Sequence, residues 1–195
     1  MLKFGLRKVC DIFKSGNTCV TGLRGRGKDL LMSNVVARRK LPYISNIDYH
    51  CKSSQYIRLD FPSLDTKNEF QDFIDGTIKK YDYPYPDGAD IYISDSGIYL
   101  PAQYYTKLDK LYGYLSTFMA LSRHLGDCNV HINAQNLNRV WDKVREQSDM
   151  YILCRSCKVL FGKLVFMRIL VYDKYQSCID RVKPFKPQIY QAKAF

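Results

Sequence analysis

The chain has 195 residues, of which 46% are hydrophobic, and these values predict one globular domain with at most a small appendage. It carries 30 lysines and arginines against 19 acidic residues, and this net charge of +11 indicates nucleic acid or an anionic membrane surface as a partner, unless the surface is simply basic and inert. Seven cysteines in mostly apolar surroundings favour buried thiols in a reducing compartment and argue against a disulfide framework.

Residues 1–16 predict a short basic amphipathic helix. Its apolar positions share one face, and most of its lysines and arginines lie opposite. The apolar positions are Leu2, Leu6, Val9, Cys10 and Phe13. This face can pack against the core, or it can dock on a membrane or on DNA. The segment lacks the apolar core of a secretory signal, and no run in the chain approaches the ~18 apolar residues of a transmembrane helix.

Residues 18–36 hold the motif around which the sequence is organised. A short buried strand, Cys19-Val20, runs into the loop Gly22-x4-Gly27-Lys28, and a helical pattern follows. In a phosphate-binding loop of this spacing, backbone N–H groups and the helix N-terminus cradle a polyphosphate while the lysine reaches its outer phosphates. Glycines suit such a loop because they adopt positive φ and let bare backbone approach the ligand. The expected nucleotide-binding residues are Gly22, Arg24, Gly25, Arg26, Gly27, Lys28 and Asp29.

Lys28 and Asp29 carry the chemistry of this loop. Lys28 should face solvent until a phosphate pairs with it. Asp29 stands where a serine or threonine normally ligates Mg²⁺. A carboxylate can hold Mg²⁺, but its charge costs about 4 kcal/mol beside a phosphate ~4 Å away, a cost that Arg24 and Arg26 could offset. We expect Asp29 to be a second Mg²⁺ carboxylate, so that Asp29→Ser keeps or raises any ATP turnover.

The chain between this motif and the next shows weaker signals. Arg38-Arg39-Lys40 places basic charge at a helix C-terminus, where it is favourable, and these residues are expected to contact DNA together with lysines of the C-terminal tail. A strand is predicted at 42–47 and irregular chain at 48–65. A modest helix across 66–80 and a turn-rich connector at 83–88 follow.

Residues 89–95 predict an apolar strand that ends in a carboxylate. A P-loop NTPase uses such a strand beside the loop strand, and its aspartate holds Mg²⁺ opposite the phosphates. Asp95 is therefore the other expected metal ligand, and Asp95→Asn should remove turnover. Many ATPases follow this aspartate with a glutamate that polarises the attacking water. Here Ser96 follows, so that role is vacant.

The next segments alternate between helix and strand. A long helix is predicted over 107–124 and a buried strand over 128–134. Gln135 follows that strand, at the end where a parallel sheet binds ligands, so it is expected to point toward the γ-phosphate. A helix over 137–147 carries Arg145.

The last part of the sequence predicts more strand. One strand is expected at 150–154 and a β-hairpin at 159–172, turning around Phe161-Gly162-Lys163. The basic tail from Asp180 should have little regular structure. Cys154-x-x-Cys157 has no second Cys or His pair at zinc spacing, so it does not predict a metal site.

With these residues placed, the chain resembles the zonular occludens toxin (Zot) family, the assembly and export ATPases of filamentous phages, related to the FtsK/HerA DNA-pumping ATPases. The resemblance covers roughly residues 17–155. The matching motifs are Val20-Thr-Gly22 to Gly27-Lys28, Ile44-Ser-Asn46-Ile, the strand ending at Asp95 with Pro101 after it, Ser122-Arg123-His124-x-Gly126, Ala134-Gln135-Asn136 and Val144-Arg145-Glu146.

The resemblance implies ATP and Mg²⁺ as cofactors. The metal would lie near Asp95, and Gln135 would sense the γ-phosphate. Arg123 or Arg145 would act in trans as an arginine finger in a ring-like homo-oligomer. Implied partners are single-stranded or double-stranded DNA and other phage assembly proteins, in the host cytoplasm or peripherally at the inner membrane. Family members usually carry a membrane-spanning segment after the ATPase domain, and the absence of one here means that membrane anchoring is not expected.

These inferences combine into one expectation of fold and function. The fold is α/β, a P-loop NTPase with a mostly parallel sheet flanked by helices and a C-terminal β-hairpin. Residues 1–16 form the basic helix, 17–178 the ATPase domain and 179–195 the basic, proline-containing tail. The expected function is a viral ATPase that drives DNA into a particle or out with one. The alternative is a non-hydrolysing P-loop scaffold that binds DNA, and a nucleotide kinase is disfavoured because no acceptor motif or lid is evident.

Overall fold

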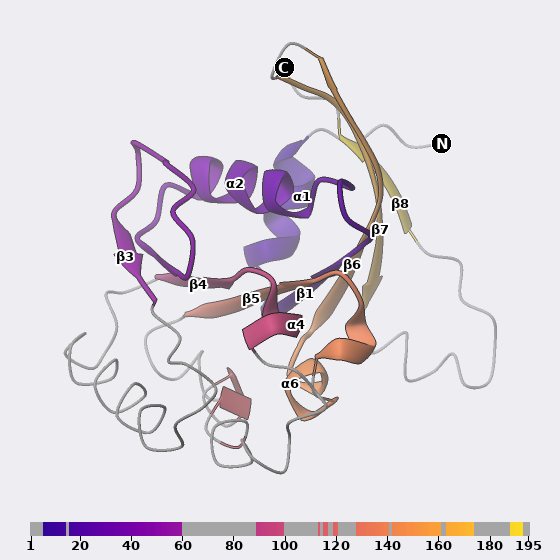
Figure 1. Cartoon of the computed structure of the whole chain (residues 1–195). Coiled ribbons are helices and arrows are strands. Elements are labelled where there is room, and N and C mark those ends of the chain that lie inside the picture. The colour runs from indigo at the N-terminus through magenta and orange to yellow at the C-terminus, as the bar shows by residue number, and fades with distance from the viewer. Residues whose placement is uncertain are drawn as a thin grey trace.

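The fold is α/β, with one mixed sheet covered by helices on both faces (Figure 1). The computed structural model describes residues 6–14, 16–59, 89–99, 113, 115–116, 119–120, 128–140, 142–160, 163–173 and 188–192. The helix expected over 66–80 and the connector at 83–88 lie outside the described residues. Of the helix expected over 107–124, only five positions are described, and all five are helical.

The sheet has eight strands in the order β3-β2-β4-β5-β1-β6-β7-β8. From β3 to β6 in this order all neighbours are parallel, whereas β7 and β8 run antiparallel. The elements are α1 (Leu6–Lys14), β1 (Thr18–Thr21), α2 (Lys28–Arg39), β2 (Tyr43–Ser45), β3 (Tyr56–Arg58), β4 (Asp90–Ile93), α4 (Ser96–Tyr99), β5 (Asn129–Ala134), a 3₁₀ helix (Leu137–Arg139), α6 (Asp142–Glu146), β6 (Met150–Leu160), β7 (Lys163–Asp173) and β8 (Gln188–Ala192).

The strand order corrects one expectation. β4, the strand that leads to Asp95, was expected beside the loop strand β1. Instead β5 lies between them, pairing with β1 on one side and with β4 on the other. Parallel strands are joined by long crossovers, so their neighbours in the sheet are not set by local sequence. As a result, the end of β5 adjoins both the glycine-rich loop and the end of β4.

Both faces of the central strands are buried, and successive side chains enter different cores. Cys19 belongs to a cluster that includes Val140 and Val144, next to α6, whereas Val20 belongs to a cluster with α1 and α2. This alternation follows from the two-residue period of a strand, and burial on both faces explains why β1 reads as a continuous apolar run. Burial raises the pKa of the Cys19 thiol to about 12. None of Cys10, Cys19, Cys51, Cys128 and Cys154 is in a disulfide.

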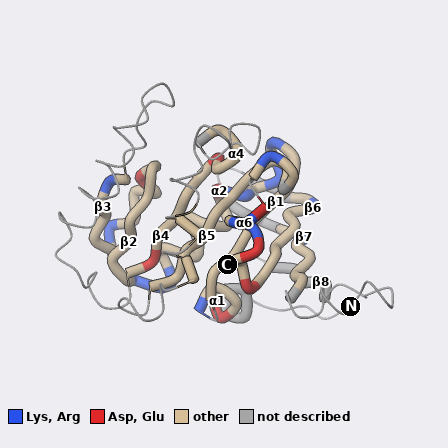
Figure 2. Tube along the Cα trace, turned by 90° about the horizontal axis from the view of Figure 1, so that it is seen from below, with Lys and Arg blue, Asp and Glu red and all other residues tan. Residues whose placement is uncertain are grey.

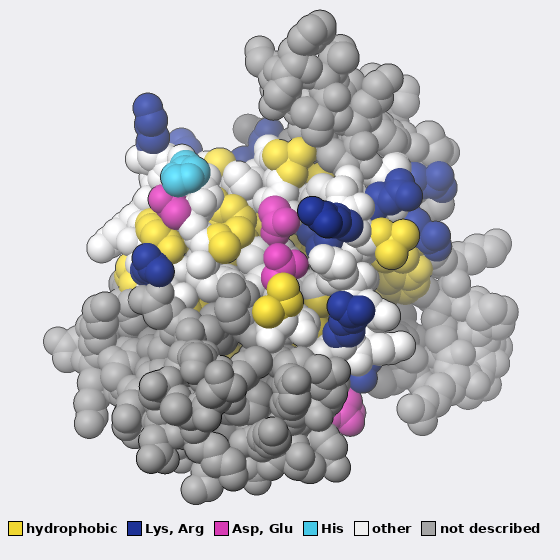
Figure 3. Space-filling model, in the orientation of Figure 1, with side chains coloured by type: hydrophobic (Ala, Val, Ile, Leu, Met, Phe, Trp, Pro, Cys, Tyr) yellow, Lys and Arg dark blue, Asp and Glu magenta, His cyan; other side chains and the backbone are white. Residues whose placement is uncertain are grey.

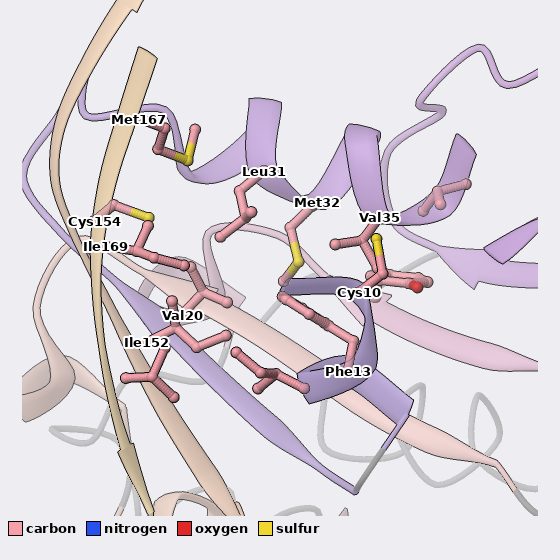
Figure 4. Packing of buried hydrophobic residues seen from close by; sticks show 14 of the residues in the cluster. Cys10, Phe13, Val20, Leu31, Met32, Val35, Ile152, Cys154, Met167 and Ile169 are labelled. Carbon is pink, nitrogen blue, oxygen red and sulfur yellow. The ribbon is translucent and has the colours of Figure 1, made fainter. Parts of the chain in front are cut away.

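The apolar face of α1 packs on this second core. Cys10, Ile12 and Phe13 are buried against α2 and the sheet (Figure 4). Fully burying side chains of this size is worth about 1.5–3 kcal/mol each. The sequence left open whether this face packs against the core or docks on a membrane or on DNA. These three residues pack against the core, so they are not exposed to a membrane or to DNA. None of the helices in the described segments is long and apolar enough to span a bilayer.

Several elements differ from the sequence predictions. The irregular region 48–65 contains the short edge strand β3, and the tail contains β8, which pairs with β7. Both predictions of irregular chain were therefore wrong at these points, because neighbouring strands supply hydrogen bonds that local sequence does not reveal. The helix expected over 137–147 is divided into the 3₁₀ helix and α6. The strand at 150–154 and the first arm of the predicted hairpin are one strand, β6.

Among the described residues, Lys and Arg positions are spread over several elements of the chain (Figure 2). Arg38 and Lys40 are exposed at the end of α2, in agreement with a surface role. Arg39 was grouped with them as a DNA contact, and this is wrong: its side chain is 7% exposed and forms an ion pair with buried Asp90.

Candidate nucleotide site

The glycine-rich loop leaves the end of β1 and returns as α2. Gly22, Gly25 and Gly27 all have positive φ, of 149°, 75° and 84°. The loop closes on itself through the N–H of Arg26, which donates to the carbonyl of Leu23 at 3.2 Å. Gly27 is the N-cap of α2 and provides no side-chain cap. The first N–H groups of α2 therefore have no side-chain acceptor at the cap and are oriented as an anion site requires.

Gly22 is the position at which the loop is most closely held. A Cβ atom there would lie 2.6 Å from the carbonyl oxygen of Cys154 in β6. At Gly25 a Cβ atom would meet nothing within 4 Å. The start of the loop is thus pressed against β6, while its middle is open to a ligand.

Lys28 does not face solvent, contrary to expectation. The residue is 6% exposed, and its Nζ donates to the carbonyl of Leu23 across the loop at 3.4 Å. Lysine stems pack readily along other groups while the ammonium seeks oxygen atoms. The ammonium therefore lies inside the loop, where the outer phosphates of a nucleotide would replace a single carbonyl as its partner.

A hydrogen-bonded cluster lies where β2, β4 and β5 end, facing the start of α2. Asp29 Oδ1 accepts two hydrogen bonds, one from Ser94 Oγ at 2.8 Å and one from Asn133 Nδ2 at 2.8 Å. Asn133 Nδ2 also donates to Ser94 Oγ at 2.8 Å. The side chain of Asn46 binds the backbone of Ser94 at two points. Its Oδ1 accepts from the Ser94 N–H at 2.7 Å, and its Nδ2 donates to the Ser94 carbonyl at 2.9 Å. The loop helix and three strand ends are thereby connected through neutral donors and one carboxylate.

Tyr49 contacts this cluster through Ser94. Its hydroxyl is 3.3 Å from Ser94 Oγ. Burial raises the pKa of Tyr49 above its usual range, and the charge on Asp29 adds to the shift. The hydroxyl therefore stays protonated and remains a neutral member of the cluster.

Arg24 and Arg26 were expected to offset the charge of Asp29. Both are exposed, and in the described part of the chain neither forms an ion pair with it. The hydrogen bonds from Ser94 and Asn133 hold the carboxylate instead. Asp29 is thus exposed, with no ion-pair partner among the described residues.

Asp95 follows Ser94 in the turn after β4. It has a φ of 50°, in the left-handed region that aspartate tolerates better than most residues. Its N–H donates to Asn133 Oδ1 at 2.8 Å, and its carbonyl accepts from the N–H of Ile98 at 2.8 Å. No described residue donates a hydrogen bond to its carboxylate, which is half-buried.

The oxygen atoms at these strand ends fit Mg²⁺. This ion prefers oxygen ligands in octahedral geometry and is usually held by one or two carboxylates together with substrate phosphates and water. Asp29 Oδ2 accepts no hydrogen bond from a described residue and is free for such a role, as is the Asp95 carboxylate. Within the described ranges no three His, Cys, Asp or Glu residues gather, so a site built of protein ligands alone is not formed there. On the face drawn in Figure 3, acidic side chains lie next to one another with Lys and Arg side chains beside them.

A cavity of about 420 Å³ opens on the other side of the loop's first residues. It lies between the end of β1, the end of β5 and the β6–β7 pair. Its lining is Thr21, Gly22, Leu23, Gln135, Asn136, Asn138, Tyr151, Leu153 and Tyr172. Gln135 is exposed and lines this cavity next to the loop, and its expected contact with a γ-phosphate stays a prediction. The cavity is next to the phosphate loop and has room for part of a nucleotide.

The two candidate arginine fingers are placed differently. Arg123 lies outside the described residues. Arg145 is half-buried in α6, where its guanidinium donates to Asn138 Oδ1 at 3.5 Å. Its Nε–H is buried and donates to no acceptor among the described residues. Within this part of the chain, the hydrogen-bonding capacity of Arg145 is therefore partly unused.

Besides Tyr49, three residues of the cluster were not singled out from sequence as site residues: Asn46, Ser94 and Asn133. Asn46 appeared only as part of a matching motif. Each follows or ends a short apolar run that forms a parallel strand. Since ligands bind at the carboxyl ends of such strands, a search for polar residues at every predicted strand end would have found them.

Comparison with known proteins finds similar solved structures. No protein-family model matches the sequence, and no curated protein does. Among solved structures, the genome packaging NTPase B204 from Sulfolobus turreted icosahedral virus 2, in complex with AMPPCP, has a TM-score of 0.57 and 11% identity, covering 92% of this chain and 98% of that chain. The N-terminal domain of zonular occludens toxin from Neisseria meningitidis has a TM-score of 0.56 and 15% identity, covering 90% and 93%.

A third similar structure is the pCW3 conjugation coupling protein TcpA, solved with ATPgS. Its TM-score is 0.51 at 16% identity, and the match covers 95% of this chain but 61% of that chain. At such identities the likeness establishes architecture. With the loop geometry and the strand order, it shows that this chain has the α/β fold of the P-loop NTPases.

Proposed function

We propose that this protein is a viral P-loop ATPase that drives DNA into a particle or out with one, working as a ring-like homo-oligomer. The observation that carries the proposal is the arrangement around Lys28. An ammonium lies inside a loop of positive-φ glycines at a helix N-terminus without a side-chain cap, and oxygens of the Asp29 and Asp95 carboxylates, in α2 and after β4, accept no hydrogen bond from a described residue. That combination suits a polyphosphate with its Mg²⁺.

The solved structures support the nucleotide part of this proposal. B204 has been solved with AMP, AMPPCP and ATP-gammaS, and it is described as a genome packaging NTPase. TcpA is described as a conjugation coupling protein. Packaging and conjugation both move DNA, and we extend this substrate class to the present chain.

The charge of the chain supports DNA as the partner. With a net charge of +11, binding to a polyanion releases counterions and requires no base-specific contact. Arg24, Arg26, Arg38 and Lys40 are exposed and available for such contacts. Arg145, with its unused Nε, is our candidate for completing the site of a neighbouring copy, together with Arg123.

The test uses Lys28→Met, which keeps the buried stem of the side chain and removes only the ammonium. A charged hydrogen bond is worth about 1.5–3 kcal/mol, so affinity for Mg²⁺-AMPPCP measured by calorimetry should fall by at least about tenfold. Lys40→Met removes an exposed charge from the other end of the same helix and should leave the affinity unchanged. Equal affinities in wild type and Lys28→Met would overturn the assignment of the loop.

Turnover separates a motor from a binder. ATP hydrolysis should be measurable in the wild type, should rise with single-stranded or double-stranded DNA, and should be lost in Lys28→Met. Asp29 in place of the usual hydroxyl is the observation that favours the alternative, a P-loop scaffold that does not hydrolyse ATP. Nucleotide binding without turnover, even with DNA present, would establish that alternative.

A further inference from the structure

In the contact between Asp29 and Ser94, the carboxylate and the hydroxyl occupy the opposite positions from those in other P-loop NTPases. In P-loop NTPases Mg²⁺ is held by a hydroxyl that follows the loop lysine and by a carboxylate at the end of a neighbouring strand. In this chain the residue after Lys28 is the carboxylate. The residue that meets it from the end of β4 is a hydroxyl, and the two are joined by a 2.8 Å hydrogen bond.

The identity of the meeting residue is fixed by the surrounding contacts. Ser94 is 2% exposed, and Asn46 binds both its N–H and its carbonyl. Asn133 then joins Ser94 Oγ and Asp29 Oδ1 through one amide nitrogen. Asp95, which the sequence assigned to the metal, receives no such bonds on its side chain from the described residues. Its backbone is held in the turn by Asn133 and Ile98.

We propose that the two Mg²⁺-holding groups have exchanged places in this protein, and that the exchange releases Asp95 to orient the attacking water. Asp29 supplies the metal carboxylate from the loop helix, and Ser94 supplies the hydroxyl from the strand end. Asp95 takes the role that appeared vacant at Ser96. This proposal rests on the proposed function for its catalytic part, whereas the exchange itself concerns Mg²⁺ and nucleotide binding.

The exchange accounts for a charge that was difficult to explain from sequence. Asp29 beside a strand-end aspartate would place two carboxylates at the metal in addition to the phosphates. With Ser94 as its partner, a single carboxylate remains in the pair, as in the usual arrangement. The net charge of the pair is therefore unchanged, and no compensation from Arg24 or Arg26 is needed.

Asp95 would act on water in a balanced hydrolysis step. The water oxygen bonds to the γ-phosphorus, and the bond from that phosphorus to the β–γ bridging oxygen breaks, with its electron pair leaving on ADP. The water's proton passes to the Asp95 carboxylate and then to the phosphate that is released. A positioned carboxylate of this kind contributes about 10²–10⁴-fold to a rate.

The exchange is tested by restoring the usual order in the double variant Asp29→Ser, Ser94→Asp. Asp29→Ser alone leaves two hydroxyls, so the gain in AMPPCP affinity on adding Mg²⁺ should fall by at least about tenfold, as for loss of a metal-site group. Ser94→Asp alone puts two carboxylates in contact, so without Mg²⁺ or nucleotide its Tm should fall by at least about 5 °C. The double variant should return both values close to wild type.

Asp29→Asn is the matched control, because it keeps an acceptor for Ser94 and Asn133 but removes the charge. It should keep the wild-type Tm and lose the Mg²⁺ effect on affinity. A double variant no better than the worse single variant would overturn the exchange. These readouts need no turnover, so they stand even if the protein does not hydrolyse ATP.

Asp95→Asn tests the second half of the proposal. Its Mg²⁺-dependent affinity for AMPPCP should stay within about threefold of wild type, while turnover should fall by about 10²-fold or more. Loss of the Mg²⁺ effect in Asp95→Asn, with Asp29→Ser behaving as wild type, would return the metal to Asp95 and overturn the proposal. Absence of turnover in the wild type would count against the proposed function and the water-orienting role, but not against the exchange.

Discussion

At each end of strand β4 an aspartate links the strand to α2, and the charges of these two aspartates are balanced in different ways. At the amino end, Asp90 is 1% exposed and forms a two-point ion pair with Arg39, in which the Nη2 donates to Oδ1 at 3.0 Å and the Nε contacts Oδ2. Tyr92 adds a hydrogen bond at 3.2 Å. At the carboxyl end, the partners of Asp29 among the described residues are the neutral groups of Ser94 and Asn133.

The difference lies in whether the carboxylate has a counter-ion among the described residues. A buried charge is stable only with a partner of opposite sign and full hydrogen bonding, and Asp90 has both within its own chain. Asp29 has hydrogen bonds without a cation and remains exposed. The chain therefore leaves negative charge at the end that faces the phosphate loop, where an external cation can bind.

The largest expected effect comes from breaking the ion pair between Arg39 and Asp90 at the amino end of β4. Arg39→Met should destabilise the protein by about 3–5 kcal/mol, because Asp90 would remain buried without its counter-ion. The measurement is the free energy of unfolding in urea. Arg38→Met, one residue away and exposed, is the control and should change stability by less than about 0.5 kcal/mol. Equal stabilities of the two variants would contradict the view that the Asp90 ion pair holds this end.

An intermediate effect is expected at the loop, where shape rather than charge is decisive. Gly22→Ala should destabilise by about 2–4 kcal/mol, because the methyl group would press on the Cys154 carbonyl and the residue would be held at positive φ.

Gly25→Ala provides the comparison within the same loop. It has a similar sign of φ but open space, so about 1–2 kcal/mol is expected from backbone strain alone. Thermal unfolding of both variants measures the difference. A Gly25→Ala variant as unstable as Gly22→Ala would mean that packing on β6 does not matter.

The smallest expected effect is a pH dependence of the free energy of unfolding, which arises from His131 next to Asp90 at the amino end of β4. Burial lowers the pKa of His131, the Arg39 charge adds to this, and Asp90 acts in the opposite direction. Asp90 lies 3.7 Å from the ring but is already neutralised by Arg39, so burial prevails. In the unfolded chain a histidine titrates near ~6.5, so only that state takes up the proton as pH first falls.

The free energy of unfolding should therefore fall as pH drops through ~6.5, by at most about 1.4 kcal/mol per pH unit, and level off below the folded pKa. Urea unfolding from about pH 7.5 to 5.5 measures this slope, above the range where most carboxylates titrate. His131→Gln should flatten it. An unchanged slope in that variant would assign the effect to other groups.

The sequence by itself determined the parts of this protein that are contiguous in the chain. The glycine spacing before Lys28 predicted the loop and the helix α2, because positive φ and helix start are local properties. Short apolar runs predicted β1, β2, β4 and β5, and alternating residues around Gly162 predicted the β6–β7 hairpin. The α/β fold followed from the alternation of these strands with helices.

Only the tertiary structure decided which of these parts meet. The hydrogen bonds to Asp29 come from residues 65 and 104 positions away, and Asn133 reaches Ser94 across 39. Sequence singled out Asp95 because its carboxylate follows an apolar run, whereas the side chain that bonds Asp29 is that of Ser94, one residue earlier. Likewise β5 separates β4 from β1, and β8 completes the sheet. These choices depend on crossover connections and on packing of side chains from distant segments, which no local pattern records.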